Sequence, residues 1–366
     1  MQRIIFHIPN QIDEQLASGS HIRPLKMLAA FKEIGYHVDV IMGYVKDRRK
    51  QIQAIKTNIK NGIKYDFLYS ESSTMPTALT ERHHMPIAPL LDFRFFRFCK
   101  KHNIKIGLFY RDIHWQFEQY KTNGVDLKKT IAKFFYRLDL RYYRQVVHTL
   151  YLPSTAMYQH IPFSFSGAIK ALPPAVSKET IQQSQTSHTT DLPSNISCIY
   201  VGGLGTLYDL QLFAQVVGKR NIPFHFCTRQ NEWHQQKERY QPLPHTTKVW
   251  HVKGEELPAI YRNALIAVLF VKPTIYWNFV MAVKLFEYMA YKKPIIAVKG
   301  TAVGHFVADN DIGWAIEYTQ EALATVLDHI EKHPEIIAEK IKNIEKIIPH
   351  HTWTARARQV QKDLAL

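Results

Sequence analysis

The chain has 366 residues, enough for about two domains at roughly 150 residues each. Its 46% hydrophobic and 21% charged residues are typical of a folded globular protein and exclude a disordered or fibrous chain. The formal net charge is +16, and residues 1–150, with 25 Lys and Arg against 13 Asp and Glu, account for +12 of it. This excess favours an anionic partner, such as a membrane surface, a nucleic acid, or a phosphorylated or acidic substrate.

The sequence contains neither a membrane-span pattern nor a secretion-signal pattern. Its longest uninterrupted apolar run, 264–271, has eight residues, whereas a membrane span needs about 20. The first residues, MQRIIFHIPNQIDEQ, lack the longer apolar stretch and the cleavage site of a signal peptide. We therefore expect a cytoplasmic protein. The three cysteines form no CxxC pair, so we expect neither a disulfide nor a structural zinc.

Short apolar runs that are typical of strands alternate with longer segments of helical periodicity. The first series of predicted strands covers 4–8, 38–42, 67–69, 105–110, 149–152 and 168–172. The second series covers 196–201, 224–228, 249–251, 266–270, 295–298 and 314–316. Helical patterns between them include 24–34, 128–147, 209–218, 256–263 and 282–290. This alternation predicts an α/β protein with two doubly wound, Rossmann-like domains facing a cleft.

The domain boundary is predicted from a polar segment between the two series. Residues 177–194, SKETIQQSQTSHTTDLPS, cannot bury a core face. We therefore expect an N-terminal domain over 1–175, a linker or loop over 176–195, and a C-terminal domain over 196–349. Residues 350–366 form one further helix, which we expect to pack back on the N-terminal domain.

The C-terminal domain contains the sharpest motif, a helix–strand–loop–helix–strand pattern over 257–298. Lys284 and Glu287 are three residues apart and therefore share one helical face. A helix N-terminus attracts phosphate, Lys284 adds a cation, and Glu287 can accept hydrogen bonds from two vicinal hydroxyls. The pair therefore predicts a phosphate site beside a ribose site. The alternative interpretation is a surface ion pair on an amphipathic helix.

This segment resembles the C-terminal signature of GT-B glycosyltransferases of group 1, the family-4 type. The resemblance rests on VKLFEYMA at 283–290, KPIIA at 293–297 and the following GTAVGHFVADNDIGWAI. It implies that Glu287 binds the ribose hydroxyls and that amides near Leu285 contact the phosphates. It also implies a hexosyltransferase-like, retaining enzyme whose nucleotide-sugar donor is a substrate, with no cofactor and no metal.

The chain departs from the family pattern at two positions. The family carries another Glu eight residues before the one that aligns with Glu287, and this chain has Phe279 at that position. It also carries an Arg and a Lys after the first strand of the domain, where this chain has the glycine-rich stretch 202–205. We assign Gly203 to the donor site as a point of close backbone approach. The diphosphate would then need another cation, for which the candidates are Lys284, Lys272, Arg229 and Arg111.

The N-terminal domain contains two candidate segments. In the resembling family a small-residue loop near the N-terminus contacts the donor phosphates, which makes Gly19, with Ser20 or Arg23, the candidate here. The alternative is a helix capped by Ser20 with Pro24 in its first turn.

The second N-terminal segment directly follows the predicted strand 105–110, at a carboxyl end, where doubly wound sheets bind ligands. Arg111 can bind a phosphate, while Asp112 or His114 can orient or deprotonate an acceptor hydroxyl. Glu71, after the preceding strand, is a further candidate for the same crevice. The alternative is an Asp that caps a helix among packed aromatic residues.

Two other motif interpretations are weaker. Gly202–Gly205 follows a strand but lacks the third glycine of a dinucleotide fingerprint, since Tyr208 occupies that position. Asp309 and Asp311 spell the DxD of metal-dependent transferases, but they precede a glycine between a helix and a strand. We therefore interpret them as a turn and expect no metal site.

The segment 93–145 has 13 Lys or Arg against four acids and many aromatic residues. We expect a core-facing stripe of apolar residues along its second helix, at Ile131, Phe134, Phe135, Leu138, Tyr142 and Val146. The remaining basic face is either simply solvated or binds an anionic membrane surface. Nucleic acid is disfavoured because no known binding motif accompanies the charge.

Together these features predict a glycosyltransferase that moves a sugar from a nucleoside diphosphate, with UDP favoured, to a hydroxyl of a glycan or lipid-linked acceptor. The resemblance points to bacterial capsule, exopolysaccharide or lipopolysaccharide synthesis, at the inner face of the cell membrane. Two alternatives stay open: a GT-B-type sugar-nucleotide epimerase, and a non-catalytic protein that binds polyanions.

Overall fold

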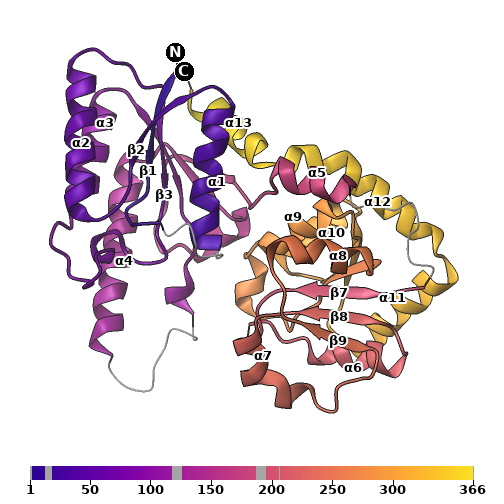
Figure 1. Ribbon diagram of the computed structural model, residues 1–366. Coiled ribbons are helices and arrows are strands. Elements are labelled where there is room, and N and C mark those ends of the chain that lie inside the picture. The colour runs from indigo at the N-terminus through magenta and orange to yellow at the C-terminus, as the bar shows by residue number, and fades with distance from the viewer. Residues whose placement is uncertain (1, 13–18, 118–125, 187–194, 206, 366) are drawn as a thin grey trace. The chain divides into compact units, whose positions relative to one another are not determined.

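The computed structural model divides the chain into two compact units (Figure 1). Unit 1 comprises Met1–Pro173 with Trp353–Leu366, and unit 2 comprises Pro174–Thr352. Unit 1 thus contains both ends of the chain, while unit 2 is one continuous stretch. The structure describes residues 2–12, 19–117, 126–186, 195–205 and 207–365.

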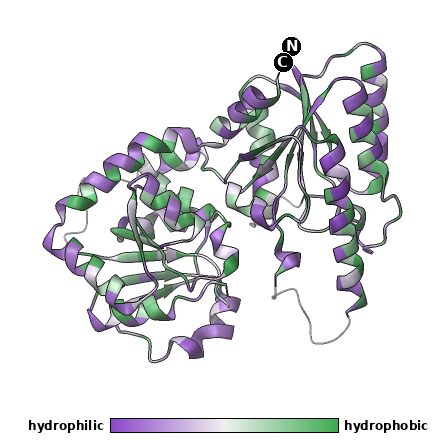
Figure 2. Cartoon of the chain, turned by 180° about the vertical axis from the view of Figure 1, so that it is seen from behind, coloured by the Kyte–Doolittle hydropathy of each residue, from purple (hydrophilic) through white to green (hydrophobic). Residues whose placement is uncertain are grey.

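Unit 1 is built on a six-stranded parallel sheet in the order β2-β1-β3-β4-β5-β6. Its strands are β1 (Arg3–His7), β2 (His37–Ile41), β3 (Phe67–Glu71), β4 (Lys105–Phe109), β5 (Thr149–Leu152) and β6 (Ala168–Ala171). Its helices are α1 (Gly19–Glu33), α2 (Val45–Lys60), α3 (Leu91–Lys101), α4 (Leu127–Val146) and α13 (Trp353–Leu364). The central strands are mostly apolar and almost wholly buried, as in β1 and β3, so helices must cover both faces of the sheet (Figure 2).

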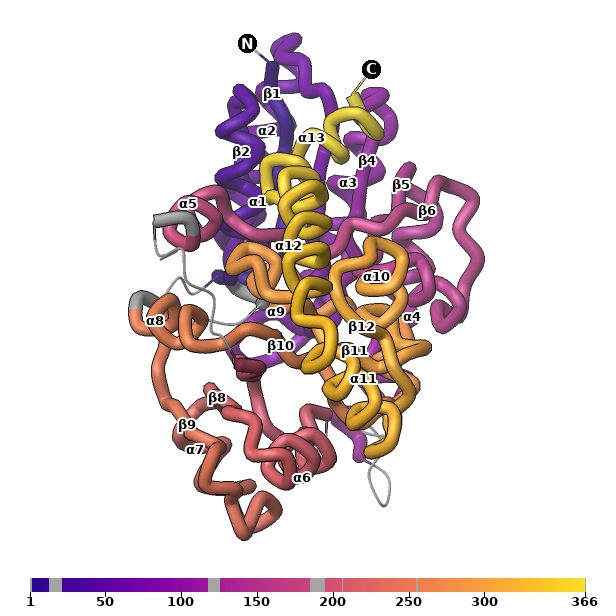
Figure 3. Tube along the Cα trace, turned by 90° about the vertical axis from the view of Figure 1, so that its right-hand side faces the viewer, coloured from indigo at the N-terminus to yellow at the C-terminus, as the bar shows by residue number. Residues whose placement is uncertain are grey.

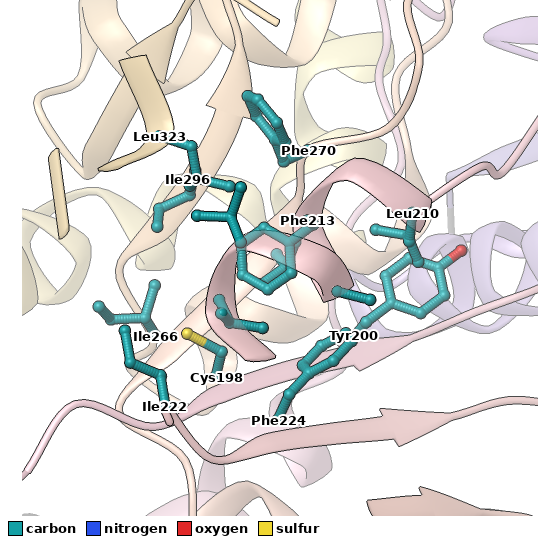
Figure 4. Close-up of a cluster of buried hydrophobic side chains, with 14 of the residues drawn as sticks. Cys198, Tyr200, Leu210, Phe213, Ile222, Phe224, Ile266, Phe270, Ile296 and Leu323 are labelled. Carbon is teal, nitrogen blue, oxygen red and sulfur yellow. The ribbon is translucent and has the colours of Figure 1, made fainter. Parts of the chain in front are cut away.

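Unit 2 repeats this architecture with the strand order β12-β11-β10-β7-β8-β9. Its strands are β7 (Cys198–Val201), β8 (Phe224–Cys227), β9 (Thr247–Trp250), β10 (Ile266–Leu269), β11 (Ile295–Val298) and β12 (Gly313–Ile316). Its helices are α5 (Lys178–Thr186), α6 (Gln211–Lys219), α7 (Gln230–Gln236), α8 (Leu257–Arg262), α9 (Val283–Ala290), α10 (Ala302–Asp309), α11 (Gln320–Lys332) and α12 (Glu335–Ile347). Phe213 of α6 packs edge-to-face on Phe224 of β8, with ring centres 5.1 Å apart, in the main core of the unit (Figure 4).

The twelve predicted strands are all present, each within two residues of its expected boundary. The prediction of doubly wound α/β sheets is therefore confirmed. The predicted linker 176–195, however, was partly wrong, because α5 occupies Lys178–Thr186. Ile181 packs against the core beside α9, and Ser184 is buried, which gives this polar helix one anchored face. Residues 187–194 of the expected linker lie outside the described residues.

The last helix of the chain is part of unit 1, where α13 packs along α1 (Figures 1 and 3). The Thr354 hydroxyl donates to Glu33 Oε2 at 2.7 Å, across the two helices. The start of α1 differs from the prediction. The helix begins at Gly19, so Pro24 lies inside it instead of in its first turn, and Ser20 is a helical residue instead of a cap.

The predicted core stripe of α4 was wrong in register except at Val146, which is buried as expected. The buried side chains of this helix are Tyr136, Asp139, Leu140, Tyr143 and Val146. Ile131 and Phe134, which were expected to face the core, are exposed, and Phe135, Leu138 and Tyr142 are half-buried. Tertiary contacts fix this rotation, because the Tyr136 ring stacks on Trp115 with centres 5.1 Å apart and its hydroxyl donates to the Thr74 carbonyl at 2.6 Å.

A buried polar network ties four elements of unit 1 together. Arg48 of α2 binds both carboxylate oxygens of Asp92 on α3, at 3.1 and 3.2 Å. Asp92 also contacts His7 Nε2 at 3.0 Å, and His7 Nδ1 lies 2.8 Å from the Ser70 hydroxyl. The Ser–His–Asp order resembles a hydrolase triad, but all of these side chains are buried and Arg48 holds the carboxylate. The network therefore stabilises the packing of these four elements.

None of the described helices is long and apolar enough to cross a bilayer.

A second buried carboxyl group, that of Asp139 on α4, has few polar partners. Its Oδ2 accepts from the Thr77 amide at 2.8 Å, while its Oδ1 is buried with no hydrogen-bond partner. Burial raises the pKa of Asp139 to about 7, and the negative charge of Asp92 contributes in the same direction. The protonated form is therefore favoured in the folded state below about pH 7.

We predict that Asp139→Asn changes how stability depends on pH. Because the folded pKa is raised, the wild type loses stability as pH rises from about 4 to 7, by up to about 4 kcal/mol. The Asn variant lacks this loss, so its free energy of unfolding relative to wild type should increase between pH 4 and 8. Urea unfolding followed by circular dichroism measures this, with exposed Asp47→Asn on α2 as the control. Equal pH dependence in wild type and Asp139→Asn would contradict the prediction.

Candidate functional site

In unit 2 the candidate residues gather where β7 and β8 end. Gly203 lies in the loop after β7, where the Tyr200 hydroxyl donates to its carbonyl at 2.7 Å. Glu232 of α7 accepts from the Leu204 amide at 3.0 Å and would stand only 3.3 Å from a methyl group on Gly203. Arg229 forms an ion pair with the same Glu232. The glycine-rich loop, which has no cation of its own, is therefore connected to an exposed arginine through one carboxylate.

The α9 helix brings the other two predicted residues to this edge. Its apolar face, which includes Leu285 and Tyr288, is buried in the core, and this leaves Lys284 and Glu287 partly exposed on the opposite side. Lys284 Nζ donates to Glu287 Oε2 at 2.6 Å. The Tyr261 hydroxyl of α8 donates to Glu287 Oε1 at 3.0 Å. Both oxygens of Glu287 are thus oriented by neighbours.

Two contacts link α9 to the strand ends. The Tyr288 hydroxyl accepts from the Val201 amide at 2.9 Å, at the last residue of β7. Cys227, the last residue of β8, lies within electrostatic range of both Lys284 and Glu287. Burial raises the pKa of the Cys227 thiol to about 12, with Lys284 opposing the shift, so this thiol is neutral and not a nucleophile at neutral pH.

The Leu285 amide and position 279 are less available to a ligand than the motif suggested. The Leu285 amide donates to the Ala282 carbonyl at 3.2 Å, inside the first turn of α9, and its side chain is buried. Phe279, at the position of the missing acid, is fully buried and packs edge-to-face on Tyr276 with centres 5.3 Å apart. The apolar core of unit 2 therefore takes up the position that carries a carboxylate in the resembling family.

In unit 1 the carboxyl end of β3 carries a fully buried carboxylate, Glu71, between two arginines. Arg111 Nη2 donates to Glu71 Oε2 at 2.9 Å, and Arg23 Nε lies 3.2 Å from Oε1. The Tyr69 hydroxyl also donates to Oε1 at 3.0 Å. The Arg23 guanidinium lies 3.5 Å from the centre of the Phe109 ring. Burial lowers the pKa of Arg111, with Glu71 opposing the shift and Arg23 adding to it.

Asp112 and His114 lie together just beyond β4. The Asp112 Oδ1 atom accepts from the His114 amide at 3.0 Å, and its Oδ2 atom lies 3.5 Å from His114 Nδ1. Asp112 therefore binds the first amide of the short 3-10 helix His114–Gln116 and also orients the imidazole. The His114 ring meets Tyr136 edge-on and is about one-third exposed, so it can reach a ligand.

The structure thus places the predicted residues in two groups. Gly203, Lys284, Leu285 and Glu287 belong to unit 2, and Gly19, Arg111, Asp112 and His114 belong to unit 1. Gly19 is the first residue of α1 and not part of a loop. Asp309 ends α10 and Asp311 has a left-handed backbone with φ of 51°, so the DxD sequence forms the turn before β12. Within the described residues no group of three or more His, Cys, Asp or Glu is arranged to bind a metal.

Residues 200–347 match the model of the family described as glycosyl transferases group 1. The matched region covers most of unit 2. The matched range contains Gly203, Tyr261, Lys284 and Glu287, and it confirms the resemblance drawn from the sequence. No curated protein matches the chain in sequence.

Several solved structures share the fold of the whole chain. Anabaena Alr3699/HepE in complex with UDP and glucose superposes with a TM-score of 0.63 at 10% identity, covering 100% of this chain and 99% of that one. A glycosyltransferase from Rickettsia africae gives 0.64 at 13% identity, covering 99% and 97%. The catalytic domain of starch synthase IV from Arabidopsis thaliana, bound to ADP and acarbose, gives 0.56 at 12%, covering 100% and 99%. At these identities the similarity establishes the GT-B fold.

Three site residues were not assigned a role from the sequence. Tyr261 precedes Glu287 by 26 residues, and Glu232 lies on a helix with no motif. Glu71 was considered only as a lining residue, not as the carboxylate that holds two arginines. The positions of Glu71 and Arg111 at the ends of adjacent strands gave a signal for their pairing, but nothing in the sequence indicated that Arg23 would join them.

We predict that Glu71→Gln lowers the free energy of unfolding by about 3–5 kcal/mol, because it removes the carboxylate that pairs with the buried Arg23 and the largely buried Arg111. Adding Arg111→Met removes one of those charges. The double variant should therefore lose less stability than the sum of the two single variants. Urea unfolding monitored by circular dichroism checks both statements, and strictly additive losses would contradict the coupling.

Proposed function

We propose that the protein transfers a sugar from a nucleoside-diphosphate sugar, with UDP as the favoured nucleotide, to a hydroxyl group of a glycan or lipid-linked acceptor. The observation that carries the proposal is the Tyr261–Glu287–Lys284 arrangement at the strand ends of the matched region of unit 2. The complexes of similar fold contain UDP or ADP, which supports a nucleotide donor.

The proposed donor site uses Glu287 as the acceptor for the two ribose hydroxyls. A charged acceptor strengthens such hydrogen bonds, and Tyr261 keeps the carboxylate oriented. When a diol binds, the Lys284 ammonium can turn from Glu287 Oε2 toward the diphosphate. Arg229, whose side chain is mostly exposed beside the Gly203 loop, supplies a second cation. Preorganised cations and helix amides would stabilise the charge that develops on the departing diphosphate.

The proposed acceptor site lies in unit 1, where the Asp112–His114 pair is accessible. Asp112 orients His114 so that the imidazole can accept a proton from the attacking hydroxyl. Arg111 is held by Glu71 and Ser72, so in this proposal its first role is to shape the floor of the site. Retention of configuration, independence of metal ions, a cytoplasmic location, and a place in bacterial capsule, exopolysaccharide or lipopolysaccharide synthesis are further parts of the proposal.

We predict that UDP raises the melting temperature of the wild type and that Glu287→Ala weakens UDP binding by about 10- to 150-fold, since a charge-assisted contact contributes about 1.5–3 kcal/mol. Isothermal titration calorimetry measures the affinity. Glu287→Gln, which keeps an acceptor for Tyr261, separates loss of the ribose contact from loss of local order. Glu317→Ala is the matched control, because Glu317 is an exposed, lysine-paired glutamate of the same unit. Unchanged UDP affinity in both Glu287 variants would disprove the ribose assignment.

We also predict that sugar transfer persists in EDTA, because Asp309 and Asp311 form a turn and Asp311 is paired with Lys340. The assay follows UDP release with and without acceptor hydroxyl compounds. Loss of activity that is restored by Mn²⁺ or Mg²⁺ would contradict the prediction. Donor epimerisation without any dependence on an acceptor would instead identify an isomerase on the same fold.

A further inference from the structure

The helix α4 has a second apolar stripe, on the side that faces away from the core. Leu127, Ile131 and Phe134 are 69%, 42% and 61% exposed, respectively. Their spacings of four and three residues place them on one helical face. The buried residues of α4 begin at Tyr136, and none of the side chains from 127 to 135 is buried. The N-terminal half of α4 projects beyond the sheet of unit 1 (Figures 1 and 2).

The exposed charge of α3 and α4 themselves has a single sign. Together α3 and α4 contain ten Lys and Arg residues and only two acids, Asp92 and Asp139. Both acids are buried, so every exposed charged side chain on these two helices is basic. The basic residues classed as exposed are Arg94, Arg97, Lys100, Lys101, Lys128, Arg137, Arg141 and Arg144. The two helices pack against each other through the Phe93 and Tyr142 rings, which stack with centres 4.5 Å apart.

We propose that this face of unit 1, the α3–α4 face, docks on a bilayer that contains anionic lipid, with Leu127, Ile131 and Phe134 entering the headgroup region. An apolar stripe flanked by basic residues is the pattern of a helix that lies in the membrane interface. The inference rests on the proposed function only in that a lipid-linked acceptor would be presented at such a surface. Docking itself requires neither a donor nor transfer.

The charge and the stripe together select this occupant over two others. A second copy of the chain would bring an equally basic face against the first, and like charges across an interface are unfavourable. A nucleic acid would satisfy the basic residues but would leave the two aliphatic side chains, Leu127 and Ile131, without a partner. Anionic lipid satisfies both features, because its headgroups pair with the cations and its acyl region accepts the apolar side chains.

The test uses the full chain and vesicles of phosphatidylcholine with or without phosphatidylglycerol, in a sedimentation assay at low and high salt. We expect binding that requires phosphatidylglycerol and weakens with salt. Ile131→Ser/Phe134→Ser should weaken it at least about tenfold, because serine cannot replace the buried apolar area. Ile63→Ser/Ile275→Ser is the control, because these side chains are similarly exposed, at 38% and 60%, but lie outside α3 and α4. Equal binding by wild type and Ile131→Ser/Phe134→Ser would overturn the proposal.

Insertion is separated from surface attraction by a probe at the stripe itself. Cys99, Cys198 and Cys227 are buried, so a cysteine at Phe134→Cys can be labelled selectively with an environment-sensitive dye. We expect a blue shift of the dye on phosphatidylglycerol vesicles, and the absence of a shift would overturn insertion. A dimer that dissociates in Ile131→Ser/Phe134→Ser would assign the stripe to a second copy and likewise overturn the proposal. UDP affinity is measured in parallel, so a chain that binds vesicles but no nucleotide would refute the proposed function and leave the docking inference standing.

Discussion

The parallel pairing of buried strands is the constraint on which the rest of this protein depends. A strand such as β1, paired in parallel on both edges and buried on both faces, can be followed only by a crossover connection. Every such connection leaves the sheet from the carboxyl end of a strand, and in a parallel sheet these ends all lie on the same side. Glu71 and Arg111 meet on that side in unit 1, since β3 and β4 are neighbours in register. In unit 2 the same rule brings Gly203 and Arg229 together after β7 and β8, which are paired as well.

Each carboxylate at these edges is already held by a donor before any ligand arrives. Glu71 lies between Arg23 and Arg111, Glu232 accepts from the Leu204 amide and Arg229, and Glu287 accepts from Tyr261 and Lys284. These carboxylates differ in how deeply they are buried, and their roles differ accordingly. Glu71 is fully buried, so its ion pairs stabilise the fold. Glu287 is partly exposed, so the proposed function lets a ribose diol exchange with Lys284. In the proposed function this exchange couples sugar-nucleotide recognition to release of a cation toward the diphosphate.

The strands could be predicted because an apolar run bounded by polar residues needs no tertiary information. The face of α4 could not, because this helix has two apolar stripes and helical periodicity fits both. Tyr136 and Leu140 on one side, and Ile131 and Phe134 on the other, satisfy the same spacing rule. Tertiary contacts, such as the stacking of Tyr136 on Trp115 and its hydrogen bond to the Thr74 carbonyl, decide which stripe is inside. Similarly, the Lys284–Glu287 pair could be found from local spacing, whereas Tyr261 required knowledge that α8 lies beside α9.

The buried acids of unit 1 connect its stability to its surface. Asp92 and Asp139 face inward from α3 and α4, where Asp92 is held by Arg48 and Asp139 has one unpartnered oxygen. Asp139 therefore makes an unfavourable contribution to folding that grows as pH rises from about 4 and is complete above its raised pKa of about 7. A hydrophobic residue at this position would avoid that loss, and an outward-facing acid would neutralise part of the basic surface. With both acids inside, every exposed charged side chain of α3 and α4 beside the apolar stripe is basic. This positive surface charge attracts an anionic bilayer, whereas packing of the apolar core does not require it.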